Sequence, residues 1–251
     1  MIKALLARLQ QGHRTVSFPK GKSVLPDRFR GRPVIDSAKC AAGCKLCVDN
    51  CPTGAIKKEN NALSIDLGKC LFCAQCEECC VCGAIKFSSE YRLAARSQAD
   101  LICSQQEMRL AQALDGRMQK LFGRSLKLRQ VSAGGCNACE ADTNVLTTVV
   151  FDLGRFGIQF VASPRHADGL LITGPVTENM RLALEKTYDA VPDPKITIAV
   201  GACAISGGPY INLPRVHNGA DKIIPVDLYI PGCPPHPLTI LDGLLRLLDR
   251  L

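Results

Sequence analysis

The sequence CAAGCKLCVDNCP at residues 40–52 is followed by a second cysteine-rich run, CLFCAQCEECCVC, at residues 70–82. Three cysteines of the first run recur 29 residues later: Cys44, Cys47 and Cys51 are matched by Cys73, Cys76 and Cys80. The tetrapeptide GAIK at residues 54–57 recurs at the same offset, at residues 83–86. Because self-similarity at a fixed offset indicates a repeated structural unit, we expect this part of the chain to be a duplication.

Two copies of a C-x2-C-x3-C unit, with proline after the first copy, are typical of bacterial two-cluster ferredoxins, whose cysteine thiolates bind two [4Fe–4S] clusters. In those proteins the fourth cysteine of each run binds the cluster of the other run. The predicted ligands of one cluster are Cys40, Cys44, Cys47 and Cys80. The predicted ligands of the other cluster are Cys70, Cys73, Cys76 and Cys51. The pattern therefore predicts an electron carrier.

The first run departs from the regular spacing. The pattern requires a cysteine at residue 41, which is Ala, and the nearest cysteine is Cys40. A loop extended by one residue would let Cys40 reach the iron; otherwise this cluster is of a three-iron type or uses another ligand. Cys79 competes with Cys80 as a ligand, and the GAIK register favours Cys80. The cysteines left over, Cys79, Cys82 and Cys103, are expected to be small buried residues.

Bulk composition narrows the function classes. Fifteen cysteines in 251 residues is an odd count, which argues against a closed set of disulfides. The formal charge of +8 suggests a nucleic-acid ligand. We discount that interpretation and expect no nucleic-acid partner, because a [4Fe–4S] cluster with four thiolates carries about −2, and three clusters reduce the charge to about +2. With no apolar run of about 20 residues and no signal-peptide pattern, we expect a cytoplasmic chain that is soluble by itself.

The composition divides the chain into four parts. Residues 1–36 are an N-terminal arm, whose residues 1–11 are predicted to form an amphipathic helix that packs on a membrane surface, a partner or the protein itself. Residues 37–88 are the α+β ferredoxin-like module, with a β piece at residues 62–66. Residues 89–124 are predicted to be a helical connector, since Leu110, Leu114, Met118 and Leu121 recur every three or four residues.

Residues 125–251 alternate between β and α patterns, which predicts an α/β flavodoxin-like domain with a parallel sheet and helices on both faces. The expected strands are residues 126–131, 157–162, 169–173, 195–200 and 223–229. The expected helices are residues 141–153, 178–189 and 237–251. Sheets of this kind place ligands in loops at the carboxyl ends of their strands.

Four further cysteines lie in such loops: Cys136, Cys139, Cys203 and Cys233. Each is flanked by Gly or Pro, residues that shape tight loops and let the backbone approach a bulky group. Four thiolates that converge from separate strand ends would form a site for a third [4Fe–4S] cluster. A zinc site, or four unrelated cysteines, is the alternative.

The segments GCNACE (135–140), SPRHAD (163–168), GACAISGG (201–208) and PGCPP (231–235) resemble the small subunit of energy-converting [NiFe] hydrogenases and the related subunit of respiratory complex I. This resemblance covers residues 125–251. It implies that Cys136, Cys139, Cys203 and Cys233 bind the cluster nearest to a large catalytic subunit. It also implies that Glu140 lies close to a proton route into that subunit, as a proton relay or as a structural residue.

The segment RFRGRP (28–33), the two cysteine runs and SEYRLA (89–94) resemble the dicluster ferredoxin subunit of formate hydrogenlyase and complex I. The chain is therefore expected to be a fusion of two adjacent relay subunits, which holds their clusters in proximity. The resemblance implies an electron-transfer subunit with three [4Fe–4S] clusters that makes and breaks no substrate bond itself. We expect it at the cytoplasmic face of the membrane, as a peripheral part of a complex.

The implied partners are a hydrogenase-like or complex I-like large subunit, the membrane subunits of the same complex, and an electron-donor or electron-acceptor subunit. The large subunit would hold a [NiFe] centre. Alternatively, it would lack nickel and pass electrons to quinone or another acceptor. A zinc-binding or redox-sensing structural protein is an alternative of another class.

Overall fold

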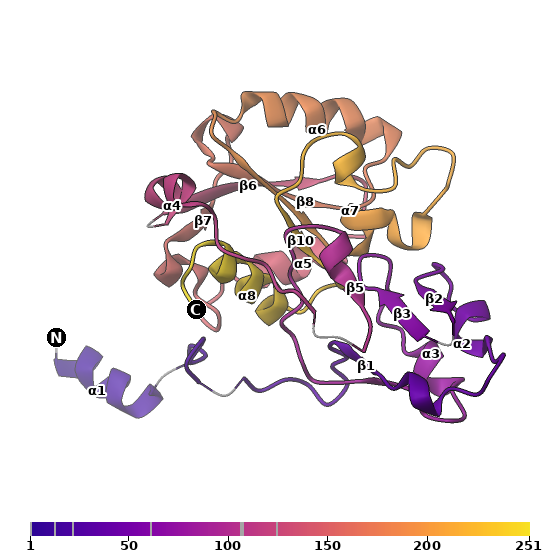
Figure 1. Cartoon of the computed structure of the whole chain (residues 1–251). Coiled ribbons are helices and arrows are strands. Elements are labelled where there is room, and N and C mark those ends of the chain that lie inside the picture. The colour runs from indigo at the N-terminus through magenta and orange to yellow at the C-terminus, as the bar shows by residue number, and fades with distance from the viewer. Residues whose placement is uncertain (1, 13, 22, 61, 106–107, 124) are drawn as a thin grey trace.

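A parallel sheet of five strands organises the C-terminal half of the chain (Figure 1). In the computed structural model, which describes residues 2–12, 14–21, 23–60, 62–105, 108–123 and 125–251, the strands lie in the order β10-β9-β8-β6-β7. Their bounds are Leu126–Ser132 for β6, Ile158–Phe160 for β7, Gly169–Thr173 for β8, Ile196–Val200 for β9 and Leu228–Ile230 for β10. All neighbouring pairs are parallel, so the predicted parallel sheet is confirmed.

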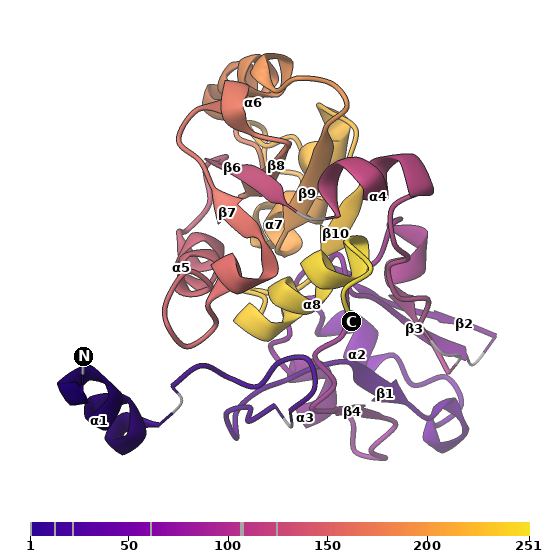
Figure 2. The same cartoon turned by 90° about the vertical axis from the view of Figure 1, so that its left-hand side faces the viewer.

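Helices cover both faces of this sheet (Figure 2). Their bounds are Ala138–Val145 for α5, Glu178–Ala190 for α6, Ala202–Ser206 for α7 and Pro237–Leu247 for α8. Successive side chains of a strand point to opposite faces. Accordingly, Leu171 of β8 belongs to the apolar cluster that contains α8, and Leu170 belongs to the cluster that contains Leu184 of α6. The predicted α/β arrangement with helices on both faces is therefore confirmed.

Four elements of this half differ from the prediction by more than one residue at an end. The strand expected at residues 157–162 is β7, which spans only Ile158–Phe160. The strand expected at residues 223–229 is confined to β10, because a short 3-10 turn at Ala220–Lys222 precedes it. The helix expected at residues 141–153 is α5, which ends at Val145, where the Thr147 and Thr148 hydroxyls donate to nearby backbone carbonyls. The helix expected at residues 237–251 ends at Leu247, shortly before Asp249 adopts a left-handed conformation with a φ of 55°.

The cysteine-rich part repeats itself in space as it does in sequence. Two short helices, α2 (Leu46–Asp49) and α3 (Gln75–Glu78), begin 29 residues apart. Gly54 and Gly83, at the same offset, have φ angles of +61° and +64°, which favour glycine at both turns. Five short strands complete this part: β1 (Pro33–Ile35), β2 (Ile56–Glu59), β3 (Ala62–Asp66), β4 (Ile85–Phe87) and β5 (Ile102–Cys103). They form antiparallel sheets in the orders β1-β4 and β2-β3-β5.

The predicted helical connector is wrong for most of its length. Within the described part of residues 89–124, only α4 (Gly116–Phe122) is α-helical, with a 3-10 turn at Ala99–Leu101. The remaining backbone bonds to distant partners: the Ala95 and Tyr229 amides donate to each other's carbonyls at 3.0 and 2.9 Å. The Leu114 amide likewise donates to the Leu247 carbonyl at 3.0 Å. Tertiary hydrogen bonds therefore override the helical spacing of the leucines.

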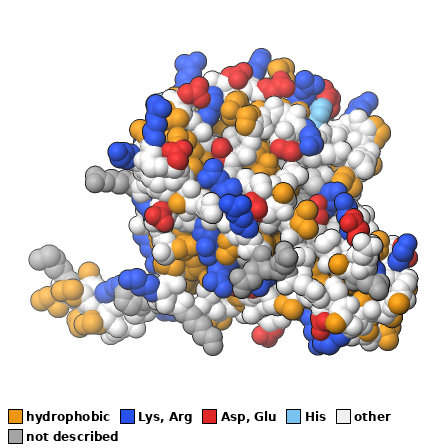
Figure 3. All heavy atoms as spheres, in the orientation of Figure 1, with side chains coloured by type: hydrophobic (Ala, Val, Ile, Leu, Met, Phe, Trp, Pro, Cys, Tyr) orange, Lys and Arg blue, Asp and Glu red, His pale blue; other side chains and the backbone are white. Residues whose placement is uncertain are grey.

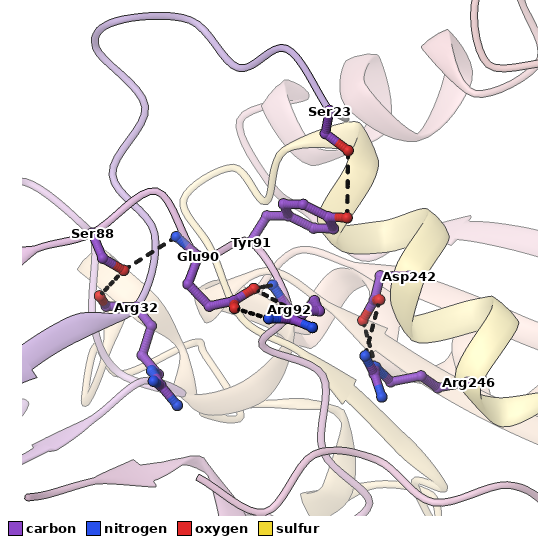
Figure 4. Close-up of polar contacts among 8 residues, drawn as sticks. All are labelled: Ser23, Arg32, Ser88, Glu90, Tyr91, Arg92, Asp242 and Arg246. Atoms are coloured by element: carbon purple, nitrogen blue, oxygen red, sulfur yellow. Dashed lines mark hydrogen bonds and ion pairs between the residues drawn. The ribbon is translucent and has the colours of Figure 1, made fainter. Parts of the chain in front are cut away.

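The start of the connector makes polar contacts beside α8 (Figure 4). The Ser88 hydroxyl donates to the Arg32 carbonyl at 2.7 Å and accepts from the Glu90 amide at 3.1 Å. The Arg92 guanidinium pairs with the Glu90 carboxylate. On α8, Arg246 Nε donates to the buried Asp242 carboxylate at 2.7 Å. Burial raises the pKa of Asp242, and Arg246 opposes that rise.

The N-terminal helix α1 (Ile2–Gln11) extends away from the body of the molecule (Figures 1 and 2). None of its residues is buried, and Ile2, Leu5, Leu6 and Leu9 are 52% to 80% exposed. Figure 3 shows these hydrophobic side chains gathered on the protruding segment. The expected helix is confirmed over the described residues, and it does not pack on the protein's own core.

Candidate functional site

The four cysteines of the C-terminal half lie at the carboxyl ends of strands. Cys136 and Cys139 follow β6, Cys203 lies on α7 directly after β9, and Cys233 follows β10. Cys139 and Cys203 are buried, whereas Cys136 and Cys233 are exposed. Parallel strands bring their carboxyl ends to one edge of a sheet, where such folds bind ligands. The chain therefore presents these thiols at one edge, partly open to the outside.

These four thiols influence one another electrostatically, so they are neighbours. Burial raises the pKa of Cys203 to about 12, and Cys233 and Cys136 contribute to the rise. Burial also raises the pKa of Cys139, with further contributions from Cys203, Glu140, Cys233 and Cys136. Burial away from water disfavours the charged thiolate, and a metal ion that takes the place of the proton removes that penalty.

The backbone at two glycines lies so close to the buried sulfurs that a side chain there would collide with them. A Cβ atom on Gly201 would lie 2.5 Å from Cys139 Sγ, and a Cβ atom on Gly208 would lie 2.9 Å from Cys203 Sγ. Both glycines have positive φ angles, of +89° and +53°. Their missing side chains therefore allow the backbone to approach the sulfurs, as a bulky group ligated there requires. The residues present fit a [4Fe–4S] cluster.

Glu140, next to Cys139, is buried with 6% exposure and is hydrogen-bonded. Its Oε1 atom accepts hydrogen bonds from Ser132 Oγ and Thr173 Oγ1, both at 2.6 Å. These hydroxyls come from the ends of β6 and β8, and sequence reasoning did not single them out. A carboxylate held by two hydroxyls beside a ligand cysteine has the partners that either a proton relay or a structural anchor needs.

In the cysteine-rich part, one small pocket is lined by all four members of a predicted set, Cys51, Cys70, Cys73 and Cys76. Burial raises the pKa of Cys70 and of Cys76 to about 12 each, and the neighbouring thiols of the set contribute to both shifts. The Ala55 amide donates to Cys51 Sγ, and the Phe72 amide to Cys70 Sγ, each at 3.3 Å. Such N–H···S bonds stabilise a thiolate ligand and adjust the potential of its cluster.

Three thiols of the other predicted set, Cys40, Cys47 and Cys80, lie near one another, along with two extra thiols, Cys79 and Cys82. Cys44, the fourth member of the set, neighbours Cys79. Burial raises the pKa of Cys47 to about 11, with contributions from Cys79, Cys40 and Cys80. The Ala84 amide donates to Cys80 Sγ at 3.2 Å, 29 residues after the equivalent bond of Ala55. Cys82 Sγ lies 3.7 Å from Cys80 Sγ and is exposed. The expectation of a small buried residue is thus confirmed for Cys103, at 2% exposure. It is wrong for Cys82, which is exposed, and Cys79 is only half-buried.

Loops of the two halves meet at their cysteines. Cys73 is among the residues that raise the pKa of Cys233, after burial and Cys136. Ser206 Oγ, at the end of α7, donates to the Gly68 carbonyl at 2.8 Å. A hollow of about 290 Å³ beside Cys233 is lined from both halves, by residues that include Phe29, Phe72 and His236. The Cys70 set is therefore next to the Cys233 set.

Single metal ions are a different case from clusters. Among the residues that the structure describes, no group of three or more His, Cys, Asp or Glu side chains is arranged to hold one metal ion. In a [4Fe–4S] cluster, by contrast, each thiolate binds its own iron atom at a separate corner. In the described ranges there is also no helix long and apolar enough to cross a membrane.

Comparison with known proteins gives matches to the C-terminal half. Residues 136–247 match the family described as NADH ubiquinone oxidoreductase, 20 Kd subunit. The probable membrane-bound hydrogenase subunit mbhJ of Pyrococcus furiosus is 43% identical over 145 residues, 58% of this chain and 84% of that protein. Formate hydrogenlyase subunit 7 of Escherichia coli is 46% identical over 139 residues, 55% of this chain and 54% of that protein.

An NADH-quinone oxidoreductase subunit of Clostridium beijerinckii is 43% identical over 118 residues, which are 47% of this chain and 70% of that protein. The chain thus spans about half the length of the formate hydrogenlyase subunit and most of the length of the other two. All three relatives are named as subunits of oxidoreductases or hydrogenases.

Proposed function

The chain belongs to the family of the 20 kDa subunit of NADH ubiquinone oxidoreductase, and from that premise we propose that it relays electrons through three [4Fe–4S] clusters within a membrane-associated oxidoreductase complex. The proposal is supported by twelve cysteines that the sequence pattern divides into three sets of four, and by the closeness of sulfurs within each set. The sets are Cys40, Cys44, Cys47 and Cys80; Cys51, Cys70, Cys73 and Cys76; and Cys136, Cys139, Cys203 and Cys233.

The proximity of Cys73 to Cys233 suggests the order of the relay. The cluster of Cys70 and Cys73 would stand between the other two, because its ligands neighbour the C-terminal set. When bound, the clusters supply one-electron redox chemistry. The protein's own residues bind them, bury some of the thiols, such as Cys70, Cys139 and Cys203, and donate N–H···S bonds that adjust their potentials. The chain itself contributes no substrate-binding step.

The Cys136 and Cys233 edge is the face on which we expect a large catalytic subunit to dock, since both cysteines are exposed there. The relatives named as hydrogenase subunits favour a partner with a [NiFe] centre, in a complex of the formate hydrogenlyase type. The relative named as an NADH-quinone oxidoreductase subunit favours the second candidate, a nickel-free partner that reduces quinone or another acceptor. Nickel analysis of the intact complex separates the two.

Helix α1 supplies a means of peripheral association at the cytoplasmic membrane face. Its leucines form one exposed apolar stripe, and residues 1–26 contain five Lys and Arg but no Asp or Glu. Such a helix binds an anionic lipid surface by burying its apolar face among the headgroups while its cations meet the negative charge.

Metal analysis of the anaerobically purified chain tests the relay. We expect about twelve iron atoms per chain with matching sulfide, as three [4Fe–4S] clusters require. A folded protein that contains a few zinc ions per chain and no iron would support the alternative of a zinc-binding structural protein.

A further inference from the structure

Lys58 lies on β2 and reaches across to the loop of Cys40. Its ammonium donates to Cys40 Sγ at 3.2 Å, to the Ala41 carbonyl at 3.0 Å and to the Cys44 carbonyl at 3.0 Å. An ammonium carries three N–H donors, so these three bonds use its full capacity. The bonds therefore hold both Cys40 and Ala41, the residue that occupies the position where the regular pattern has its cysteine.

The internal repeat provides a comparison for Lys58. The residue 29 positions later is Phe87, on β4. Phe87 lines the pocket of the other cysteine set, and its ring lies 6.1 Å from the ring of Phe72. The duplicated unit therefore places a cation against one cysteine set and an aromatic ring against the other, at equivalent positions.

We propose that Lys58 is a positioning residue, which holds the Cys40 sulfur in place across the extended loop and makes the reduction potential of the Cys40 cluster more positive than that of the Cys70 cluster. This inference rests on the proposed cluster relay. Reduction adds a negative charge to a cluster, and a cation bonded to a ligand sulfur stabilises that added charge. A phenyl ring offers no such charge.

The consequence concerns where an electron resides within the cysteine-rich part. The Cys70 cluster is the one that neighbours Cys233. A more positive potential at the Cys40 cluster would hold the electron at the outer end of the relay, away from the C-terminal set. The Cys40 cluster would then act as a reservoir facing the external donor or acceptor.

The test is an EPR-monitored redox titration of the full chain, purified anaerobically, with iron counted in every sample. Lys58→Met removes the charge and the donors at nearly constant length, and Lys58→Arg keeps the charge. Lys57→Met is the matched control, since Lys57 is the preceding, exposed residue of the same strand. We expect K58M to move one cluster to a more negative potential, while K58R moves it less and K57M leaves all potentials unchanged.

Loss of about four irons in K58M, restored in K58R, would support the positioning role. In that case the potentials of the wild type would be compared with those of Lys58→Gln, which keeps an N–H donor without the charge. This inference would be overturned, and the relay left intact, if K58M or K58Q had the iron content of the wild type and the same cluster potentials as K57M. A wild-type chain without iron would overturn the relay and this inference with it.

Discussion

The Ser206 hydroxyl donates a hydrogen bond of 2.8 Å to the Gly68 carbonyl, and this bond joins α7, which carries Cys203, to the loop that leads into Cys70. Ser206 is 8% exposed, so the bond is shielded from water. A second bond between the two halves runs from Gln98 Nε2 to the Ile205 carbonyl at 3.1 Å. These two hydrogen bonds therefore hold the two cysteine-bearing halves together at the place where the proposed relay requires an electron to pass between them.

Replacement of Ser206 by Ala tests that junction. The Gly68 carbonyl would lose its hydroxyl partner, and an unsatisfied buried acceptor costs about 1–3 kcal/mol of folding free energy. We expect S206A to keep its iron, to unfold at lower denaturant concentration, and to transfer electrons more slowly between the Cys70 and Cys203 clusters. Thr148→Ala, which removes an exposed hydroxyl with a local bond, is the control. Equal stability of S206A and wild type would contradict the role of the bond.

Gly201→Ala tests whether the glycine at the Cys139 sulfur is required. Its Cβ would lie 2.5 Å from Cys139 Sγ, and its φ of +89° disfavours any side chain. We expect this variant to lose about four irons per chain, those of the C-terminal cluster. Gly116→Ala, where a Cβ would meet nothing within 4 Å, should retain all of its iron. Full iron content in G201A would show that the approach of backbone to sulfur is not needed.

The identity of the irregular ligand can be decided by two serine variants. Cys40→Ser is expected to convert its cluster to a three-iron form or to destroy it, because Cys40 lies with Cys47 and Cys80 in one set. Cys82→Ser is expected to leave the cluster unchanged, since Cys82 is exposed beside Cys80. EPR spectra of the oxidised proteins distinguish these forms. A normal spectrum for C40S together with an altered one for C82S would exchange the two assignments.

Membrane association can be tested with vesicles. We expect the wild-type chain to co-sediment with anionic vesicles and to bind neutral ones weakly, since residues 1–26 carry only basic charges. The double variant Leu5→Gln/Leu9→Gln removes two exposed side chains of α1 and should reduce binding by about tenfold or more, given about 0.8 kcal/mol per buried methylene. Leu213→Gln changes an exposed leucine outside α1 and serves as control. Unchanged binding of the double variant would contradict membrane association through α1.

Much of the fold follows from local pattern. The apolar strands, such as β8 at its predicted residues 169–173, are recognisable because every residue is buried. The cysteine repeat predicts a duplication, and Gly54 and Gly83, one repeat apart, adopt closely similar positive φ angles. The connector was mispredicted because the Leu114 amide bonds to Leu247, a partner that no local window contains.

The candidate site, too, could be predicted from the sequence only in part. The spacing of the cysteines predicts which sulfurs bind the same cluster, and the structure places several sulfurs of each predicted set near one another. The contacts of Lys58 with Cys40, and of Thr173 with Glu140, join residues that are 18 and 33 positions apart. Lysine and threonine are common on strands, so their types alone carry no signal of these roles. Only the tertiary arrangement assigns them.

EPR spectroscopy of the anaerobically reduced chain and of its Cys203→Ser variant tests the central claim most directly. The relay predicts three interacting [4Fe–4S] signals in the wild type and, in C203S, the loss of one signal while the two clusters of the cysteine-rich part remain. A folded wild-type protein that is colourless, iron-free and silent in EPR would contradict the account.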